Sequence, residues 1–339
     1  MAENIIEQIV VGLRGLVTDP YAEYGELRNI RVVGHTPKLD HYIYDVVVDF
    51  AQGSERIAAK VYRVNKCGAT GAVRMARTEA ANLNRVYDLF RKRNLTGVPR
   101  PLGDFTELGA VVAEKYSGLP LQSIIMKAAL LPGYADRGVL ALAARKAGEW
   151  LRNFHKATAD SHEPFDGDAL LEDVERLCKS CKGEGLDDGS VKMILEGARA
   201  SLARSKKALP ASSVLCDFTP LNVIVGEQGV GMCDYARMQS RGISLNDVAM
   251  FLASVEALEK YPFCNRDITA RVQEEFSNAY SIPVQEQAIL RVLKMKTLLA
   301  MFAQGRAVKE SALRKKVMWA TVMKKFIHQS AARSLSPAA

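Results

Sequence analysis

The sequence SSVLCDFTPLNVIVGEQGVGMCDYARM, residues 212–238, determines the fold prediction. Its start, Val214-Leu215, is typical of the end of a buried strand. Pro220 makes the chain leave that strand, because proline cannot donate a hydrogen bond to a strand ladder. Two short apolar runs joined by Gly226-Glu227-Gln228-Gly229 then predict a hairpin. We expect this hairpin to bring Asp234 back beside the polar loop around Pro220.

Three polar residues in this stretch suit phosphoryl transfer. Asp217 and Asn222 lie five positions apart on the loop, and Asp234 lies at the foot of the hairpin. One carboxylate can orient an attacking hydroxyl and accept its proton, while the amide oxygen and the other carboxylate can hold Mg²⁺ against the phosphates of a nucleotide. Asp and Asn are also common turn residues, which is the alternative interpretation of each residue taken alone.

The arrangement resembles the aminoglycoside phosphotransferase and choline kinase group, small-molecule kinases with a protein-kinase-like fold. The catalytic segment of that group reads H-G-D-x-x-x-x-N and is followed by I-D-F, I-D-Y or I-D-W. The matching positions here are Leu215-Cys216-Asp217, Asn222 and Cys233-Asp234-Tyr235. The resemblance implies that Asp217 is the catalytic base and that Asn222 and Asp234 bind Mg²⁺. Leu215 replaces the usual histidine and Cys216 the frequent glycine, but the chemistry above requires neither side chain.

The composition is that of an ordinary globular protein. With 339 residues, 48% of them hydrophobic, the chain is long enough for two domains or one bilobal unit. The formal net charge of +8 suits anionic partners such as a nucleotide, a phosphorylated sugar or a lipid surface. Lys and Arg are nevertheless spread along the chain and form no nucleic-acid-binding motif, so we expect no nucleic acid partner. The oligomeric state stays open.

The six cysteines are interpreted as reduced thiols. The N-terminus does not resemble a secretory signal, and no apolar run approaches the roughly 18 residues that a membrane span requires. We therefore expect a cytoplasmic protein without a transmembrane segment. Cys178 and Cys181 form a C-x-x-C pair without a second pair, so we interpret them as structural and expect no zinc.

The first part of the chain predicts a helix followed by an antiparallel meander. Apolar residues from Ile5 to Leu16 recur at helical spacing, and strands are expected at 30–33, 41–50 and 56–62. The segment 34–38, which begins with Gly34, is predicted to be the turn between the first two strands. In the kinase-like group such a turn covers the nucleotide phosphates, so the resemblance implies phosphate contacts there. An ordinary hairpin turn is the alternative.

Lys60 is the one charged residue inside the apolar strand segment 57–61. An unpaired buried ammonium costs several kcal/mol, so this lysine requires a partner. Glu79 lies nineteen positions later, in a helical pattern over 73–90. We predict that the two residues pair and that the ammonium faces the phosphates of the nucleotide. The alternative is a solvated lysine and a surface glutamate.

The strand predicted at 109–114 runs into a segment that contains glycine and proline. Its position between the other motifs implies a hinge, where backbone groups of Glu114, Lys115 and Tyr116 meet the adenine edge. We therefore predict an α+β, bilobal protein-kinase-like fold with a small antiparallel-sheet lobe and a mainly helical lobe. The nucleotide-binding lobe is expected at 1–116, and the helical lobe with the catalytic loop and substrate-binding helices at 117–339.

Several helices are expected in the second lobe. His155 lies on a helix up to residue 158 and is interpreted as a hydrogen-bonded packing residue. Asp247 is expected to cap the next helix or to hold the catalytic loop in place. Further helices are expected at 284–304 and 311–332. The second of these has apolar residues on one side and lysines beside them, so it suits either core packing or contact with an anionic membrane.

The predicted function is Mg²⁺-dependent transfer of the γ-phosphate of ATP or GTP to a hydroxyl of a small molecule or sugar. The alternative, supported by Leu215 and by the glycine-poor turn, is a catalytically silent nucleotide-binding module. A cationic acceptor would favour an acidic pocket, for which the candidates are Asp166, Asp168, Glu172 and Asp173. The basic net charge instead favours a phosphorylated, lipid-linked or polysaccharide sugar, so the acceptor stays open.

Overall fold

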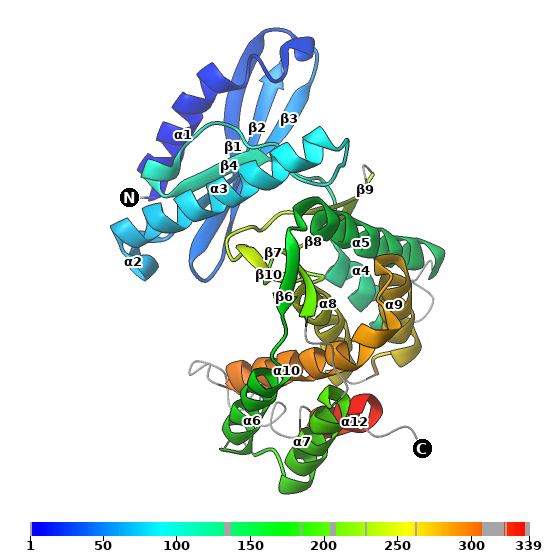
Figure 1. The fold of residues 1–339 in the computed structure, drawn as a ribbon. Coiled ribbons are helices and arrows are strands. Elements are labelled where there is room, and N and C mark those ends of the chain that lie inside the picture. The colour runs from blue at the N-terminus through cyan, green and yellow to red at the C-terminus, as the bar shows by residue number, and fades with distance from the viewer. Residues whose placement is uncertain are drawn as a thin grey trace. The chain divides into compact units, whose positions relative to one another are not determined.

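The computed structural model describes residues 2–131, 137–183, 185–203, 208–227, 229–261, 263–306, 322 and 324–335. The chain divides into two units, Met1–Gly118 with Ile224–Met238, and Leu119–Val223 with Gln239–Ala339. The first unit therefore includes residues 224–238, which the predicted division at residue 116 assigned to the second lobe. Figure 1 shows the elements of both units.

A four-stranded antiparallel sheet forms the basis of the first unit. Its strands are β1 (Leu27–Pro37), β2 (His41–Phe50), β3 (Ser54–Tyr62) and β4 (Ala110–Glu114), hydrogen-bonded in that order. Every second side chain of β2 from Tyr44 to Phe50 is buried, because successive residues of a strand point to opposite faces. Helix α1 (Ala2–Leu16) adds Ile9 and Leu13 to the same apolar core (Figure 1). The predicted N-terminal helix and meander are confirmed.

The turn predicted at 34–38 is wrong. Strand β1 continues through Gly34 to Pro37, and Gly34 pairs with Asp45 beside a register shift that begins at Val32. A bulge of this kind absorbs an extra residue without ending the ladder, so a glycine here is compatible with a continuing strand. The reversal lies just beyond, where the backbone N–H of Lys38 donates to the carbonyl oxygen of His41 at 2.8 Å.

Helix α3 (Ala69–Lys92) packs on this sheet and carries Glu79 on its buried face. The buried side chains recur every three or four residues, which is the pattern of one helix face: Ala72, Ala76, Glu79, Leu83, Val86 and Phe90. The predicted helix is confirmed, although it extends beyond the predicted 73–90 at both ends. Three short helical segments lie in the connections, α2 (Val64–Cys67), η1 (Ala22–Tyr24) and η2 (Thr106–Leu108).

The predicted hairpin after the polar loop is confirmed as β8 (Val223–Gly226) and β9 (Gly229–Met232). Backbone contacts fix it within the first unit, since the N–H of Met232 donates to the carbonyl oxygen of Gly97 at 3.0 Å. A Cβ atom at Gly226 would overlap the carbonyl oxygen of Ser117, so the close approach requires glycine. Asp234 comes two positions after β9 and therefore belongs to the first unit.

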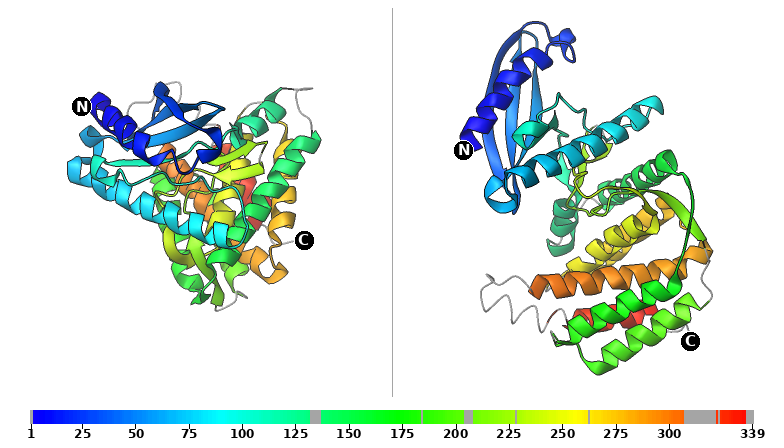
Figure 2. Two further views of the ribbon diagram at one scale, coloured as in Figure 1. Left: turned by 90° about the horizontal axis from the view of Figure 1, so that it is seen from above. Right: turned by 60° about the vertical axis from the view of Figure 1, so that its left-hand side comes forward.

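The second unit is mainly helical. Its helices are α4 (Leu121–Leu130), α5 (Arg137–Thr158), α6 (Gly167–Gly183), α7 (Asp188–Leu202), α8 (Leu245–Glu256), η3 (Ala257–Lys260), α9 (Arg266–Tyr280), η4 (Val284–Glu286), α10 (Gln287–Arg306) and α12 (Lys324–Leu335). The strands are β5 (Leu119–Pro120), β6 (Ser161–Pro164), β7 (Ala208–Val214) and β10 (Gln239–Ile243), of which β10, β7 and β6 form a sheet in that order. Figure 2 shows α6, α7, α10 and α12 packed together.

The last two described helices, α10 and α12, pack within the second unit. The helix predicted at 284–304 is confirmed as η4 and α10. Of the helix predicted at 311–332, residues 311–321 and 323 lie outside the described residues. In α12 the apolar side chains of Phe326 and Ile327 are buried, and Arg333 pairs with Glu259 at 3.0 Å. The buried face favours core packing over membrane contact for this part of the helix.

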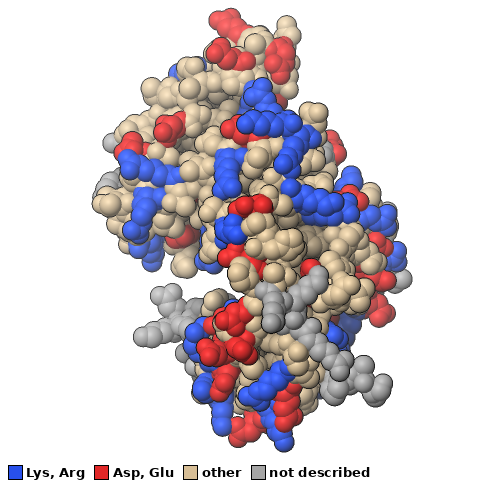
Figure 3. All heavy atoms as spheres, viewed as in Figure 1, with Lys and Arg blue, Asp and Glu red and all other residues tan. Residues whose placement is uncertain are grey.

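The length and apolar character of the described helices bear on whether one of them could cross a membrane. None of them combines the length and the apolar character that crossing a lipid bilayer requires. On the face seen in Figure 3, acidic and basic side chains are interspersed. This distribution agrees with the spread of Lys and Arg along the sequence.

Candidate active site

One buried carboxylate holds the loop that follows strand β7. Asp247 is fully buried, and its two oxygens accept the backbone N–H groups of Leu215 at 2.7 Å and Cys216 at 2.8 Å. Its Oδ2 also lies 3.1 Å from Nε2 of His155, whose Nδ1 lies 2.9 Å from the hydroxyl of Tyr280. The structure thus confirms that Asp247 ties down the loop and that His155 is a hydrogen-bonded packing residue.

The backbone of Cys216 has a left-handed conformation, with φ at 59°. A side chain in this region clashes with its own backbone, whereas glycine adopts the region freely. The catalytic segment that this loop resembles often has glycine at the position of Cys216, and the observed φ gives a physical reason for glycine there. The chain therefore keeps the sharp turn before Asp217 although it has a less suitable residue there.

Cys216→Gly is expected to stabilise the second unit. A residue with a Cβ pays about 1–2 kcal/mol to adopt the left-handed backbone, and the substitution removes this strain. Glycine has more conformational freedom in the unfolded chain, which offsets about 0.5–1 kcal/mol of the stabilisation. The net change should be about 0.5–1 kcal/mol, or a few degrees in melting temperature. Thermal unfolding of the wild type, Cys216→Gly and Cys216→Ala measures it. If alanine stabilises as much as glycine, backbone strain is not the cause.

Phe218 and Asn222 also hold the loop that contains Asp217. Phe218 is fully buried and stacks on Trp150, with ring centroids 5.8 Å apart, and it also contacts the ring of Phe251. The carbonyl oxygen of Asp217 accepts Nδ2 of Asn222 at 3.0 Å. The second unit therefore brings Asp217 and Asn222 together on a loop that is anchored by one aromatic side chain and by its own hydrogen bonds.

The first unit brings together Lys60, Glu79 and Asp234. Nζ of Lys60 lies 3.0 Å from Oε1 of Glu79 and 3.2 Å from Oδ1 of Asp234. The side chain of Lys60 is 12% exposed and that of Glu79 is 4% exposed, so the pair is almost completely removed from water. The predicted pairing is confirmed, and Asp234 is a second partner that the sequence did not predict for this lysine.

Glu79 is also the acceptor for two further groups. The hydroxyl of Tyr62 donates to its Oε2 at 2.6 Å, and the backbone N–H of Tyr235 lies 3.4 Å from its Oε1. Sequence reasoning missed Tyr62. It stands two positions after Lys60 on β3, where side chains point to the same face, so the spacing could have revealed it.

The surroundings determine the charges of this cluster. Burial would lower the pKa of Lys60, but the carboxylates of Glu79 and Asp234 outweigh burial and raise it. Burial raises the pKa of Glu79, against the opposing effect of Lys60. We take the ionised pair as the state near neutral pH, because the hydrogen bonds that Glu79 accepts all favour its carboxylate. The ammonium then faces two carboxylates.

The predicted hinge residues are Glu114, the last residue of β4, and the two residues that follow it, and most of their polar groups have partners within the first unit. The backbone N–H groups of Glu114 and Lys115 donate to the carbonyl oxygens of Arg100 and Arg56. The side chain of Glu114 accepts the hydroxyl of Tyr21 at 2.8 Å, and Nζ of Lys115 lies 2.7 Å from Asp45.

Tyr116 differs from its two neighbours. Within the described part of the chain, its backbone N–H makes no hydrogen bond. Adenine contact through a backbone N–H therefore stays a prediction for Tyr116, whereas the N–H groups of Glu114 and Lys115 are already engaged.

Gly34 is not forced to be glycine by its surroundings. It is exposed, and a Cβ built on it would meet open space. A phosphate contact at Gly34 therefore has no local structural support beyond its place near the end of β1, and it stays a prediction.

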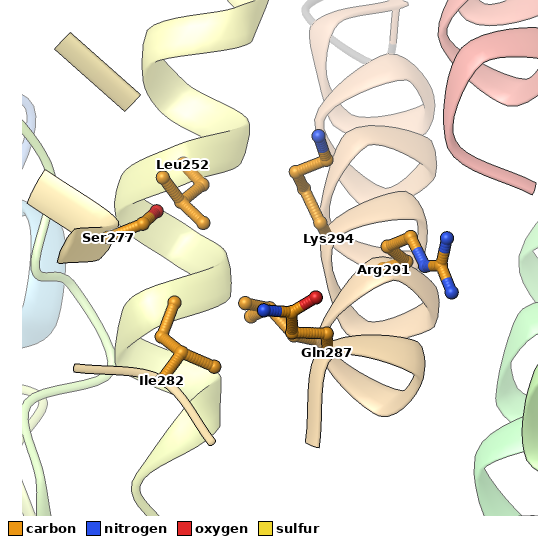
Figure 4. Close-up of a pocket in the computed structure, with 7 residues that line it drawn as sticks. Leu252, Ser277, Ile282, Gln287, Arg291 and Lys294 are labelled. Atoms are coloured by element: carbon orange, nitrogen blue, oxygen red, sulfur yellow. The ribbon is translucent and has the colours of Figure 1, made fainter. Parts of the chain in front are cut away.

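A cavity in the second unit does not involve the predicted residues. Its volume is about 220 Å³, and the residues that line it are Leu252, Ser277, Ile282, Gln287, Leu290, Arg291 and Lys294. In Figure 4 the guanidinium of Arg291 points away from Leu252 and Ser277. Nζ of Lys294 lies 2.5 Å from Oε2 of Glu256. Both cations are thus turned or bound away from the cavity, and we assign no function to it.

Comparison of sequences finds no relative of this chain. No protein-family model matches, and no curated protein sequence matches significantly. Comparison of structures gives a different result. The aminoglycoside phosphotransferase APH(4)-Ia, in a ternary complex with AMP-PNP and hygromycin B, is 14% identical over 95% of this chain and 98% of its own, with a TM-score of 0.55. The chain has the fold of the small-molecule kinases.

Two further solved structures support this statement. A glucosamine kinase in complex with glucosamine, ADP and inorganic phosphate is 14% identical over 91% of this chain and 95% of its own, with a TM-score of 0.52. A putative fructosamine-3-kinase from Thermobifida fusca is 17% identical over 96% and 98%, with a TM-score of 0.51. The predicted α+β, protein-kinase-like fold of the aminoglycoside phosphotransferase and choline kinase group is therefore confirmed.

Proposed function

We propose that this protein transfers the γ-phosphate of ATP or GTP to a hydroxyl group of a small molecule or sugar. The observation that carries the proposal is the buried cluster of Lys60, Glu79 and Asp234 in a small-molecule kinase fold. A lysine that is nearly excluded from water and kept charged by two carboxylates is a suitable donor to nucleotide phosphates. A structural lysine would not need the second carboxylate.

The ligands of the similar structures agree with this proposal. One of them holds glucosamine with ADP and inorganic phosphate, and another holds hygromycin B with AMP-PNP. In each case a nucleotide is bound together with a hydroxylated acceptor. By analogy of fold, we propose nucleotide contacts at Glu114, Lys115, Tyr116 and Gly34.

Asn222 and Asp234 would hold Mg²⁺. An amide oxygen and a carboxylate are hard oxygen ligands of the kind this ion prefers. The side-chain nitrogen of Asn222 donates to the carbonyl oxygen of Asp217 at 3.0 Å, and its amide oxygen is the proposed ligand. Oδ1 of Asp234 accepts Lys60 and the backbone N–H of Ala236 at 3.0 Å. Each of the two side chains thus offers oxygen atoms of the kind that Mg²⁺ prefers, and a bound ion would neutralise charge on the phosphates.

Asp217 is proposed as the catalytic base. It precedes Phe218 on the anchored loop, so its backbone is fixed while its side chain can orient a hydroxyl and accept the proton. A base accelerates proton transfer only when it is held rigidly beside the hydroxyl. The buried ring of Phe218 and the hydrogen bonds of Asp247 hold the backbone of this loop.

The acidic residues considered for a cationic acceptor are partly engaged elsewhere. Oδ1 of Asp166 accepts the backbone N–H groups of Asp168 and Ala169, at the start of α6. Asp173 pairs with Lys296 at 2.5 Å, and this contact lowers the pKa of its carboxyl. These two residues therefore serve the helix and its packing, which weakens the case for an acidic acceptor pocket built from them.

A silent nucleotide-binding module is the second candidate, because Leu215 stands where the related kinases have histidine. Leu215 is fully buried, and its contribution to the loop is the backbone N–H that Asp247 accepts. An ATP-consumption screen over aminoglycosides, amino alcohols and sugars separates the two candidates. Acceptor-dependent turnover that disappears in Asp217→Ala supports the kinase. Turnover that persists in this variant comes from a contaminant.

Lys60→Ala is expected to raise the Kd for Mg·ATP about tenfold to a hundredfold, the value of a charged hydrogen bond. The ammonium is the group proposed to face the phosphates, and its loss leaves Glu79 and Asp234 without a cation. Lys66→Ala is the matched control, since Lys66 is an exposed lysine on α2 of the same unit. Calorimetry measures the Kd, and circular dichroism tests folding. An unchanged Kd in a folded variant would remove Lys60 from the site.

A further inference from the structure

The first unit also contains a cavity, which is separate from the cluster of Lys60, Glu79 and Asp234. Its volume is about 320 Å³, within the range of small-molecule sites, and its lining residues are Ile5, Tyr42, Val61, Tyr62, Arg63, Val64 and Asn65. They come from α1, β2, β3 and α2, except for Arg63, which lies between β3 and α2. The walls are mostly apolar, so the cavity suits a ligand with an apolar body.

Arg63 gives this apolar cavity one cationic group. Its guanidinium carbon lies 4.8 Å from the centre of the Tyr42 ring, and Nη1 donates to the carbonyl oxygen of Lys38 at 3.1 Å. Its Nε is buried, and no described residue accepts a hydrogen bond from it. No carboxylate pairs with this arginine in the described part of the chain, so the positive charge is balanced only by a carbonyl and a ring. An acid group is the ligand feature that would complete it.

Tyr62 connects the cavity with the charged cluster. Its ring lines the cavity, and its hydroxyl donates to Glu79 at 2.6 Å. Nζ of Lys60 lies 5.4 Å from the centre of the same ring. Tyr62 is only 2% exposed, so a ligand that moves this ring also moves the group that orients Glu79.

We propose that this cavity binds a small organic anion with an apolar body and one acid group at Arg63. We also propose that the bound anion changes the affinity of the Lys60 cluster for nucleotide through Tyr62. The second statement rests on the proposed function, whereas the first does not. Coupling of this kind must be reciprocal: the nucleotide changes the affinity for the anion by the same factor.

The first experiment tests the anion site without any nucleotide. The probe is 8-anilinonaphthalene-1-sulfonate, and its neutral counterpart is N-phenyl-1-naphthylamine, which has the same rings without the acid group. We expect one sulfonate dye per chain. Arg63→Gln should weaken the sulfonate dye about tenfold or more, the value of a charge-assisted hydrogen bond, and leave the neutral dye nearly unaffected. Arg28→Gln, an exposed arginine of the same unit, is the matched control and should change neither.

Val64→Asp keeps the proposal testable if Arg63→Gln does not fold. Val64 is 38% exposed at the rim of the cavity, so aspartate can replace it without burying a charge. The new carboxylate should repel the sulfonate dye and leave the neutral dye bound. If both dyes bind the wild type equally, or if no variant weakens the sulfonate dye selectively, the anion site does not exist.

The second experiment measures the coupling. Mg·ATP is titrated with and without a saturating amount of the sulfonate dye, and we expect its Kd to change about fivefold, at the lower end of usual allosteric coupling. Tyr62→Phe should bind the dye normally and abolish the change. If the dye binds but the Kd for Mg·ATP does not change, the coupling is wrong and the site stands. If the wild type binds no Mg·ATP at all, the proposed function and the coupling both fail, and the first experiment still decides the site.

Discussion

Asp217→Asn is expected to lower kcat by about a hundredfold to ten-thousandfold, the usual contribution of a general base. The Kd for Mg·ATP should stay close to that of the wild type. Asparagine has the shape of aspartate but neither its charge nor its basicity, and the backbone oxygen of residue 217, which accepts from Thr219 and Asn222, is kept. The loop therefore keeps its form while the chemistry is lost. Steady-state kinetics and calorimetry on the same preparation measure both quantities.

Asp234→Asn is the contrasting variant of the same experiment. Oδ1 of Asp234 accepts Lys60 and the N–H of Ala236, and the carboxylate is a proposed ligand of Mg²⁺. This change should weaken metal-dependent nucleotide binding as well as turnover, because a hard anionic ligand is lost. Two results together would contradict the kinase proposal and favour the silent module. The wild type would bind nucleotide equally well without metal, and neither substitution would have a measurable effect on turnover.

Asp247→Ala is expected to lower the free energy of unfolding of the second unit by about 3–5 kcal/mol, the cost of breaking a buried polar network. The side chain is fully buried, and its removal leaves the backbone N–H groups of Leu215 and Cys216 and the ring of His155 without an acceptor. Urea unfolding followed by tryptophan fluorescence measures it. Trp150 is a buried tryptophan of this unit and therefore reports its unfolding.

Asp160→Ala is the matched control for this prediction. Asp160 is an exposed carboxylate of the same unit, and it pairs with Arg241. An exposed pair of this kind contributes about 0–1 kcal/mol, so the control should barely change the unfolding curve. If Asp247→Ala destabilises no more than Asp160→Ala, Asp247 does not hold the loop.

The elements that the sequence predicted best have strong local signals. In the hairpin of residues 223–232, the turn lies between Gly226 and Gly229, and α3 has a long apolar face. Both elements were therefore predicted with small errors at their ends. Gly34 misled the prediction. A glycine followed two residues later by Thr36-Pro37 is typical of a turn, but pairing with β2 beyond a bulge keeps the segment in the sheet. Such pairing is a long-range effect that a local pattern does not contain.

Of the two ion pairs that Lys60 makes in the site, the sequence predicted one. The pairing of Lys60 with Glu79 followed from the need to neutralise a buried ammonium. The additional contact with Asp234 did not, because it joins residues 174 positions apart and depends on the hairpin belonging to the first unit. Chain order alone gave no indication that Gly97 and Ser117 hold this hairpin.

The hydrogen bonds between Asp247 and its loop affect which sequences can form this loop. The carboxylate binds main-chain N–H groups of residues 215 and 216, and every amino acid except proline supplies such a group. Leucine and cysteine can therefore stand where the H-G-D signature has histidine and glycine while the turn persists, at the cost of backbone strain at Cys216. A search that weights the letters of the H-G-D signature loses such a chain, whereas a search that weighs shape retains it. Further chains with this fold are best sought through the buried aspartate and the strand end that it binds.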